Sequence, residues 1–211
     1  MPGLKLGLLV MLACSAAAAD GVALRDELLT RIEKDQQARF AGIAWAAEHG
    51  ADGIVDEASL TEQERQEYTA LWAEVSRIDA ENTAWLKQIV QQQGWPTYSA
   101  VGIDAGDAAW LMVQHADADP SFQRLCLDLM SALPADEMSQ SSLAMLTDRV
   151  LLAEGRGQIY GTQFIVKDGQ WVPRDLQDPD NVDARREEIG LPPLAEYKEM
   201  LEAVMRGEEI E

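Results

Sequence analysis

The chain has 211 residues, and its 37 acidic against 17 basic side chains give a formal net charge of -20. A surface this acidic repels phosphate backbones and anionic lipid headgroups, so the composition argues against nucleic-acid binding. Apolar residues make up 47% of the chain, which excludes an intrinsically disordered protein and is enough to form the core of one domain.

The N-terminus predicts a signal peptide over residues 1–19. Lys5 supplies a positive start, Leu6 to Ala13 form an apolar run too short to span a bilayer, and small residues precede Asp20. We therefore expect cleavage after Ala19 and export to the periplasm or the medium. Alternatively, the residues before Cys14 form a loose lipobox, and Cys14 would carry a lipid anchor. No later apolar run is long enough to predict a membrane span.

The remaining residues predict a mainly α fold, a single-domain bundle of about five to seven helices with one small β-hairpin near residues 159–173. We expect residues 20–75 to form an N-terminal helical extension. It would pack with a helical domain over residues 76–206 as one globular unit.

Apolar positions at helical spacing and local capping signals place the individual helices. Ser59 or Thr61 is expected to cap the second helix, Asp104 the third, and Asp119 the fourth, where Pro120 occupies the first helical position. Asp168-Gly169 between apolar segments is a hairpin signal. The first expected helix covers residues 22–49. The second begins just after Ser59 or Thr61 and runs to about residue 93, and the third follows Asp104 and runs to about residue 116. The others cover residues 120–133, 140–154, 181–189 and 194–205.

His115 is the first candidate for chemistry, because imidazole is a general acid or base near neutral pH. In a catalytic site, Asp117 would orient the imidazole, and Arg149 or Arg185 would stabilise developing negative charge. The structural alternative for His115 is a histidine that complements the dipole at a helix C-terminus.

A second polar group follows about forty residues later, where Gln158 to Gln163 carry several hydrogen-bonding side chains. If this segment is a strand, Gln158, Tyr160 and Thr162 share one face, and Gly161 marks a bulge or a close approach. A solvent-facing strand and internal salt bridges are the structural alternatives. The expected ligand-binding residues are Gln114, Tyr160, Gln163, Arg185 and Arg186.

Neither a metal nor a cofactor is expected. One histidine with neighbouring aspartates does not supply three ligands, and neither His-Glu-x-x-His nor Cys-x-x-Cys occurs in the chain. Cys126 lies between leucines in a helical segment, which is typical of a buried, unreactive thiol.

Several motifs together resemble a bacterial family, domain-of-unknown-function family 6624. The resemblance rests on Gln114-His115-Ala116-Asp117, Asp148-Arg149, Tyr160-Gly161-Thr162-Gln163 and Arg185-Arg186, within a match from about Ile78 to Tyr197. It implies a small, mainly helical and often exported domain. Because the family has no established activity, it implies no role for any residue. Residues 20–75 lie outside the resemblance.

Two functions fit these patterns. The first is a noncatalytic module of the cell envelope, with a polar site around His115 that binds an unknown small polar ligand or peptide. The alternative is a hydrolase or transferase that uses His115 as general acid or base, with water as the attacking group because no activated serine or cysteine is evident. Both require His115, Arg149 and the polar side chains of 160–186 to converge on one solvent-accessible cleft.

Overall fold

The structure, a computed structural model, describes the backbone of residues 3–208 and the side chains of residues 21–208. The predicted cleavage site after Ala19 and the predicted lipid attachment at Cys14 lie outside the described side chains. Among the residues that the structure describes, no helix combines the length and the apolar character that a membrane crossing requires.

The fold is mainly α, as predicted, with eight α-helices and one antiparallel pair of strands between residues 3 and 208. The elements are α1 (Gly3–His49), α2 (Glu62–Gln93), α3 (Tyr98–Val101), α4 (Ile103–Gln114), α5 (Pro120–Ser131), α6 (Gln140–Ala153), β1 (Phe164–Lys167), β2 (Gln170–Pro173), the 3₁₀ helix η1 (Pro179–Asn181), α7 (Val182–Glu188) and α8 (Leu194–Met205). The helix beyond the expected number is α3, whose four residues are too few to show a periodic pattern.

Local capping signals explain where two of the helices begin. Thr61 and Glu64 form the reciprocal capping box of α2, with the Thr61 amide 2.7 Å from the Glu64 carboxylate. Asp119 caps α5 by accepting a hydrogen bond from the Phe122 amide at 3.0 Å. The expected cap of α4 is wrong: Gly102 is the N-cap, and Asp104 instead pairs with Arg25 of α1.

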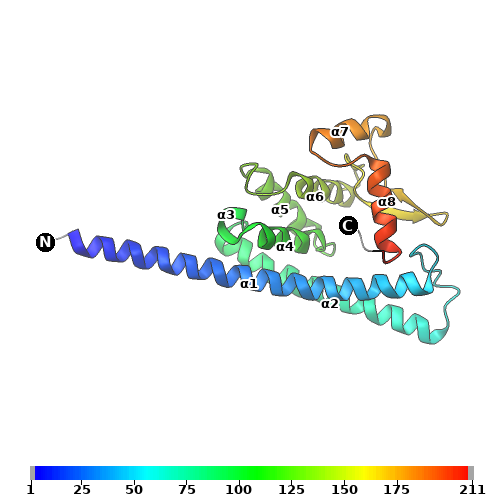
Figure 1. Cartoon of the computed structure of the whole chain (residues 1–211), viewed down its shortest axis with the longest axis horizontal. Helices are drawn as coiled ribbons and strands as arrows, with labels where there is room; N and C mark the ends of the chain where they lie inside the picture. Colours follow the sequence, from blue (N-terminus) through cyan, green and yellow to red (C-terminus); the bar gives the residue numbers. More distant parts are fainter. Residues whose placement is uncertain (1–2, 209–211) are drawn as a thin grey trace.

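Two long helices form the base of the molecule, and α4 packs on both of them (Figure 1). The chain reverses after α1, so α2 runs back alongside it. Ala105, Ala108 and Ala109 keep the buried face of α4 small, which lets neighbouring helices approach closely. The core then continues through Met112 and Val113 into α5 and α6. This arrangement brings the C-terminal end of α4 against the middle of α1 and α2.

The β-hairpin is shorter than predicted. Its strands pair from Phe164 opposite Pro173 to Lys167 opposite Gln170, so residues 159–163 precede the sheet. Gly161 has a φ of +70°, and a Cβ there would lie 2.9 Å from Leu194 of α8. The segment is therefore a tight turn with a close approach, and the expected alternation of faces does not apply to it.

Cys126 is fully buried in α5. Burial, assisted by the charge of Asp119, raises the pKa of its thiol to about 12. Because the thiolate is the reactive form, this environment agrees with the prediction of an unreactive cysteine.

Candidate functional site

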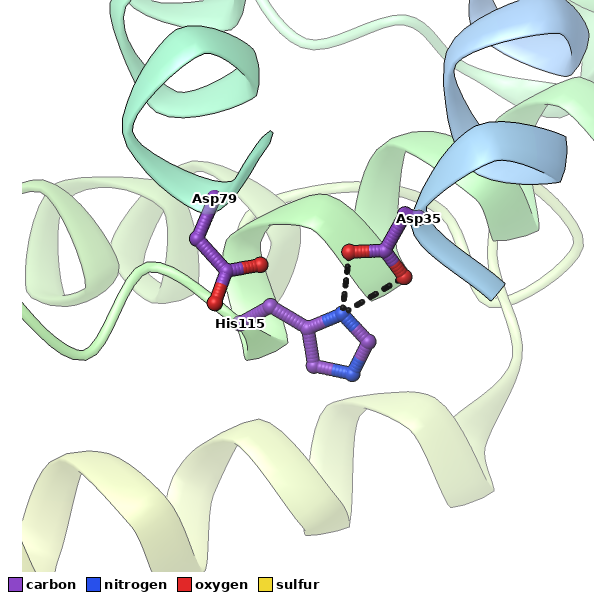
Figure 2. A group of neighbouring side chains, drawn as sticks. All are labelled: Asp35, Asp79 and His115. Carbon is purple, nitrogen blue, oxygen red and sulfur yellow. Dashed lines mark hydrogen bonds and ion pairs between the residues drawn. The ribbon is translucent and has the colours of Figure 1, made fainter. Parts of the chain in front are cut away.

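The His115 side chain is held by a carboxylate from α1. His115 follows the last residue of α4, and its Nδ1 lies 3.2 and 3.1 Å from the two oxygens of Asp35 (Figure 2). Asp35 is only 1% exposed. The imidazole is therefore oriented by Asp35, and the expectation that Asp117 would do so is wrong.

Asp35 has further polar partners on its own helix. Arg39 Nε lies 3.3 Å from one of its oxygens, and the Gln36 amide donates to it at 2.8 Å. Burial by itself raises the pKa of Asp35, but the hydrogen bond and charge of His115, together with Arg39 and Gln36, lower it to about 2. Asp35 is thus ionised at neutral pH and is the acceptor for a proton on Nδ1. In the tautomer that carries only this proton, Nε2 is the nitrogen with a free lone pair.

A second carboxylate, Asp79 of α2, shares the guanidinium of Arg39, which donates to it. Burial raises the pKa of Asp79 and outweighs the lowering effect of Arg39, and the nearby charge of Asp35 adds to the increase. The two carboxylates thus differ, because Asp35 is firmly ionised whereas Asp79 takes up a proton more readily.

Asp35, Asp79 and His115 could together hold a metal ion. Each offers one ligand atom, and these atoms lie within 4.8 Å of one another (Figure 2). Three protein ligands are the number that catalytic zinc sites use. Arg39 already neutralises the same carboxylates, however, so a cation would have to displace its guanidinium. The geometry thus permits a metal without requiring one.

His115 lines the rim of a cleft of about 520 Å³ between α2 and the corner that joins α4 to α5. We call it the histidine cleft. Its charged or polar lining includes Arg39, Asp79, Lys87, His115, Asp117 and Asp119, and its apolar lining includes Trp72, Val75, Ala80 and Ala84. Among residues 21–208, no hydrogen bond is made by His115 Nε2. This nitrogen is available to a bound molecule.

A second hollow, of about 390 Å³, adjoins the first at Asp117, which lines both. We call it the arginine hollow. Arg149 and Arg174 supply its positive charge, and Gln163 lies on its wall. Arg149 Nη1 donates to both oxygens of Asp117 at 2.7 Å. Asp117 therefore serves as the partner of Arg149.

The Tyr160-Gly161-Thr162-Gln163 motif surrounds another buried carboxylate, Asp148 of α6. Asp148 is fully buried and accepts backbone N–H groups from Ile159 at 2.7 Å, Tyr160 at 3.0 Å and Thr162 at 3.0 Å. It also accepts the Thr162 hydroxyl at 3.0 Å. The Asp148 side chain thus satisfies backbone N–H donors that would pair with a neighbouring strand if this segment were part of a sheet.

Arg185 and Arg186 bind the backbone carbonyls of the turn whose N–H groups Asp148 accepts. Arg185 donates to the Ile159 carbonyl at 3.0 Å, and Arg186 donates to the Tyr160 carbonyl at 2.6 Å. The Arg186 side chain is fully buried and stacks on the Tyr197 ring, 4.9 Å from its centroid. These arginines act on the backbone, and neither lines the histidine cleft or the arginine hollow.

The expected convergence on one cleft is thus wrong in part. His115 and Asp117 reach the histidine cleft, and Arg149 and Gln163 reach the arginine hollow beside it. Tyr160, Arg185 and Arg186 belong instead to the hydrogen-bond network of the turn around Asp148. Gln114 is buried at the end of α4, and its Oε1 has no hydrogen-bond partner among the described residues.

Sequence reasoning missed Asp35 and Arg39, although α1 carries a signal for the aspartate. The buried residues Leu28, Asp35 and Gly42 are spaced by seven along α1 and therefore lie on one stripe. A carboxylate on such an inward stripe has to find a partner from another segment.

We predict that Asp148→Asn destabilises the fold by about 3–5 kcal/mol, because an amide group would face N–H donors that need an acceptor. The free energy of unfolding from chemical denaturation measures this loss. Asp128→Asn is the matched control, since Asp128 is 66% exposed and its loss is expected to cost less than about 0.5 kcal/mol. Equal stability of the two variants would contradict the structural role of Asp148.

We predict an acid-dependent contribution from Asp35. Its folded pKa of about 2 lies below the unfolded value of about 3.9, so its stabilisation is present above the unfolded pKa and is lost as the pH falls toward 2. The difference in unfolding free energy between wild type and Asp35→Asn is expected to shrink by about 1 kcal/mol between about pH 6 and pH 3.

Asp79→Asn serves as the control for the acid dependence. Because the pKa of Asp79 is raised, its contribution to the unfolding free energy changes with pH in the opposite direction to that of Asp35. Its protonated form is favoured by folding, so its contribution is present at low pH and is lost as the pH rises through the folded pKa. Parallel pH trends for the two variants would refute this assignment of the charges.

Comparison with known sequences agrees with the resemblance found in the motifs. The profile of a family described as a family of unknown function, DUF6624, matches residues 23–207. The match is longer than the motifs suggested and includes Asp35 and Arg39, so residues 23–75 are part of the family domain. No curated protein and no solved structure matches the chain. The chain belongs to the DUF6624 family.

Proposed function

We propose that this protein is an exported module of the cell envelope that binds a small polar ligand or peptide in the histidine cleft, without catalysing a reaction. The observation that carries the proposal is the state of His115. Its Nδ1 is held by the buried carboxylate of Asp35, while Nε2 has no partner within the described side chains and the ring borders a cleft of about 520 Å³. An oriented polar group at the edge of a concave space is the usual form of a ligand site.

The lining of the cleft supports a ligand with both polar and apolar parts. Trp72, Val75 and Ala84 supply an apolar wall, and the ion pair between Lys87 and Asp119 borders the opposite end. A further hollow of about 480 Å³ shares Trp72 and Ser76 with the cleft and continues along α2. This continuity gives room for an extended ligand such as a short peptide.

The pairing of Asp35 with His115 favours a second function, a hydrolase or transferase. An ionised carboxylate that accepts the Nδ1 proton makes Nε2 a general base, as in Asp–His pairs of enzymes. The base would take a proton from water, and the Ser76 hydroxyl in the cleft already donates to the Trp72 carbonyl. We favour binding, because it requires only the oriented imidazole and the cleft.

The envelope location rests on the N-terminal sequence and on charge. A positive start, a short apolar run and small residues before Asp20 are typical of a signal peptide. The net charge of -20 makes nucleic acid an unsuitable partner.

For expression in a bacterial host, we predict a mature N-terminus at Asp20, which intact-mass spectrometry of the exported protein would identify. A lipid-modified Cys14 at the N-terminus would instead identify a lipoprotein. An uncleaved chain retained in the cytoplasm would contradict export.

We predict that a panel of envelope metabolites and short peptides contains compounds that shift the imidazole NMR signals of His115 but leave those of His49 unchanged. His49 is the matched control, because it stacks on Trp45 at the far end of α1 and does not line the cleft. His115→Ala is expected to weaken such binding by about tenfold or more, and His49→Ala is expected to have no effect.

Equal shifts at the two histidines, or none at His115 with any compound, would contradict the binding proposal. Turnover of a bound compound that disappears in His115→Ala and falls in Asp35→Asn would select the enzymatic function instead.

A further inference from the structure

The arginine hollow differs in charge from the rest of the molecule. The chain carries a net charge of -20, yet the ionisable residues that line this hollow are Arg149, Arg174 and a single aspartate, Asp117. The overall negative charge of the protein repels anions. Two guanidinium groups around one concave space create local attraction for an anion.

The hydrogen bonds of Arg149 are incomplete. Its Nη1 donates to both oxygens of Asp117, whereas its Nε is buried and has no partner among the described residues. Buried donors normally have an acceptor, and a guanidinium presents adjacent N–H groups that match two oxygens of a carboxylate or phosphate. Arg149, which lines the hollow, therefore has a donor that no described residue satisfies.

The rest of the hollow is suited to a small organic anion. Arg174 is about half exposed and has only a long contact, 3.7 Å, with Asp175, so its side chain is free to turn toward a ligand. Gln163 donates to the Thr162 hydroxyl at 3.1 Å, and its side-chain amide oxygen accepts no hydrogen bond from the described residues. Leu152 and Phe164 supply apolar walls, and the volume of about 390 Å³ suits a small molecular group.

We propose that the arginine hollow is an anion subsite, in which Arg149, assisted by Arg174, binds the carboxylate or phosphate group of a small ligand. Asp117 is the internal counter-ion with which the ligand anion competes. Because Asp117 also lines the histidine cleft, one molecule can place its anionic end beside Arg149 and its other end beside His115. This last point rests on the proposed function, whereas anion binding at Arg149 does not.

Substitutions of Arg149 and of its partner Asp117 provide the test, because the proposal predicts that they change anion affinity in opposite directions. Inorganic phosphate and succinate are titrated into the purified chain by calorimetry at constant ionic strength. Wild type is expected to bind at least one of them saturably, and the tighter of the two identifies the anion class. Arg149→Gln is expected to weaken this binding by about tenfold or more, whereas Asp117→Asn is expected to tighten it roughly threefold or more.

Arg124→Gln is the matched control. Arg124 also forms an ion pair, with Glu154 at 2.6 Å, and its substitution changes the net charge by the same amount as Arg149→Gln, but Arg124 does not line the hollow. The Arg124→Gln variant is expected to bind the anion with the same affinity as wild type. An equal loss in both arginine variants would mean that overall charge, and not the hollow, governs binding, and would overturn the proposal.

Two further outcomes would also overturn it. The first is weaker binding in Asp117→Asn as well as in Arg149→Gln, because then the pair only supports the local structure. The second is no saturable binding of either anion to wild type. His115→Ala is expected to leave phosphate affinity unchanged, so failure of the anion subsite and failure of the histidine cleft give separate results.

Discussion

The candidate site depends on one buried carboxylate. Asp35 lies on the inward stripe of α1, where a charge without partners would destabilise the fold by several kcal/mol. Its partners come from its own helix, through Arg39 and Gln36, and from the end of α4, through His115. The same contacts that make the charge tolerable therefore fix the imidazole at the edge of the histidine cleft. Stability and the geometry of the site have a common origin here.

Asp148 follows the same principle with a different result. It too is a fully buried carboxylate, but its acceptors are used by backbone N–H groups of one turn, and Arg185 and Arg186 bind the carbonyls of that turn. Most of these polar groups pair with one another, although Arg186 Nη2 is buried without a partner among the described residues. None of these residues lines the histidine cleft or the arginine hollow. Asp148 thus belongs to a structural cluster. The cluster of Asp35, in contrast, leaves His115 Nε2 without a partner among the described residues.

The division of polar residues between two adjoining hollows changes how a ligand would be recognised. His115 offers an oriented imidazole beside an apolar wall, and Arg149 offers positive charge beside Asp117, the residue that lines both hollows. A ligand that extends across both hollows would therefore contact the proposed site at two groups, the His115 imidazole and the Arg149 guanidinium. Since the protein as a whole repels anions, selection would come from local guanidinium geometry more than from long-range attraction.

Much of the fold was accessible from sequence, because periodic apolar residues, the Thr61 capping box and the Asp119-Pro120 start are local signals. The motifs also sufficed to predict the DUF6624 family, and they made His115 the first candidate for a polar site. Only the tertiary structure decided which carboxylate holds the imidazole, since Asp35 is eighty residues from His115 and Asp117 is two. The tertiary structure likewise placed Tyr160 and Arg186 in the network around Asp148. Hydrogen bonds between distant segments depend on how the helices pack, and the spacing of residues along the chain does not encode that packing.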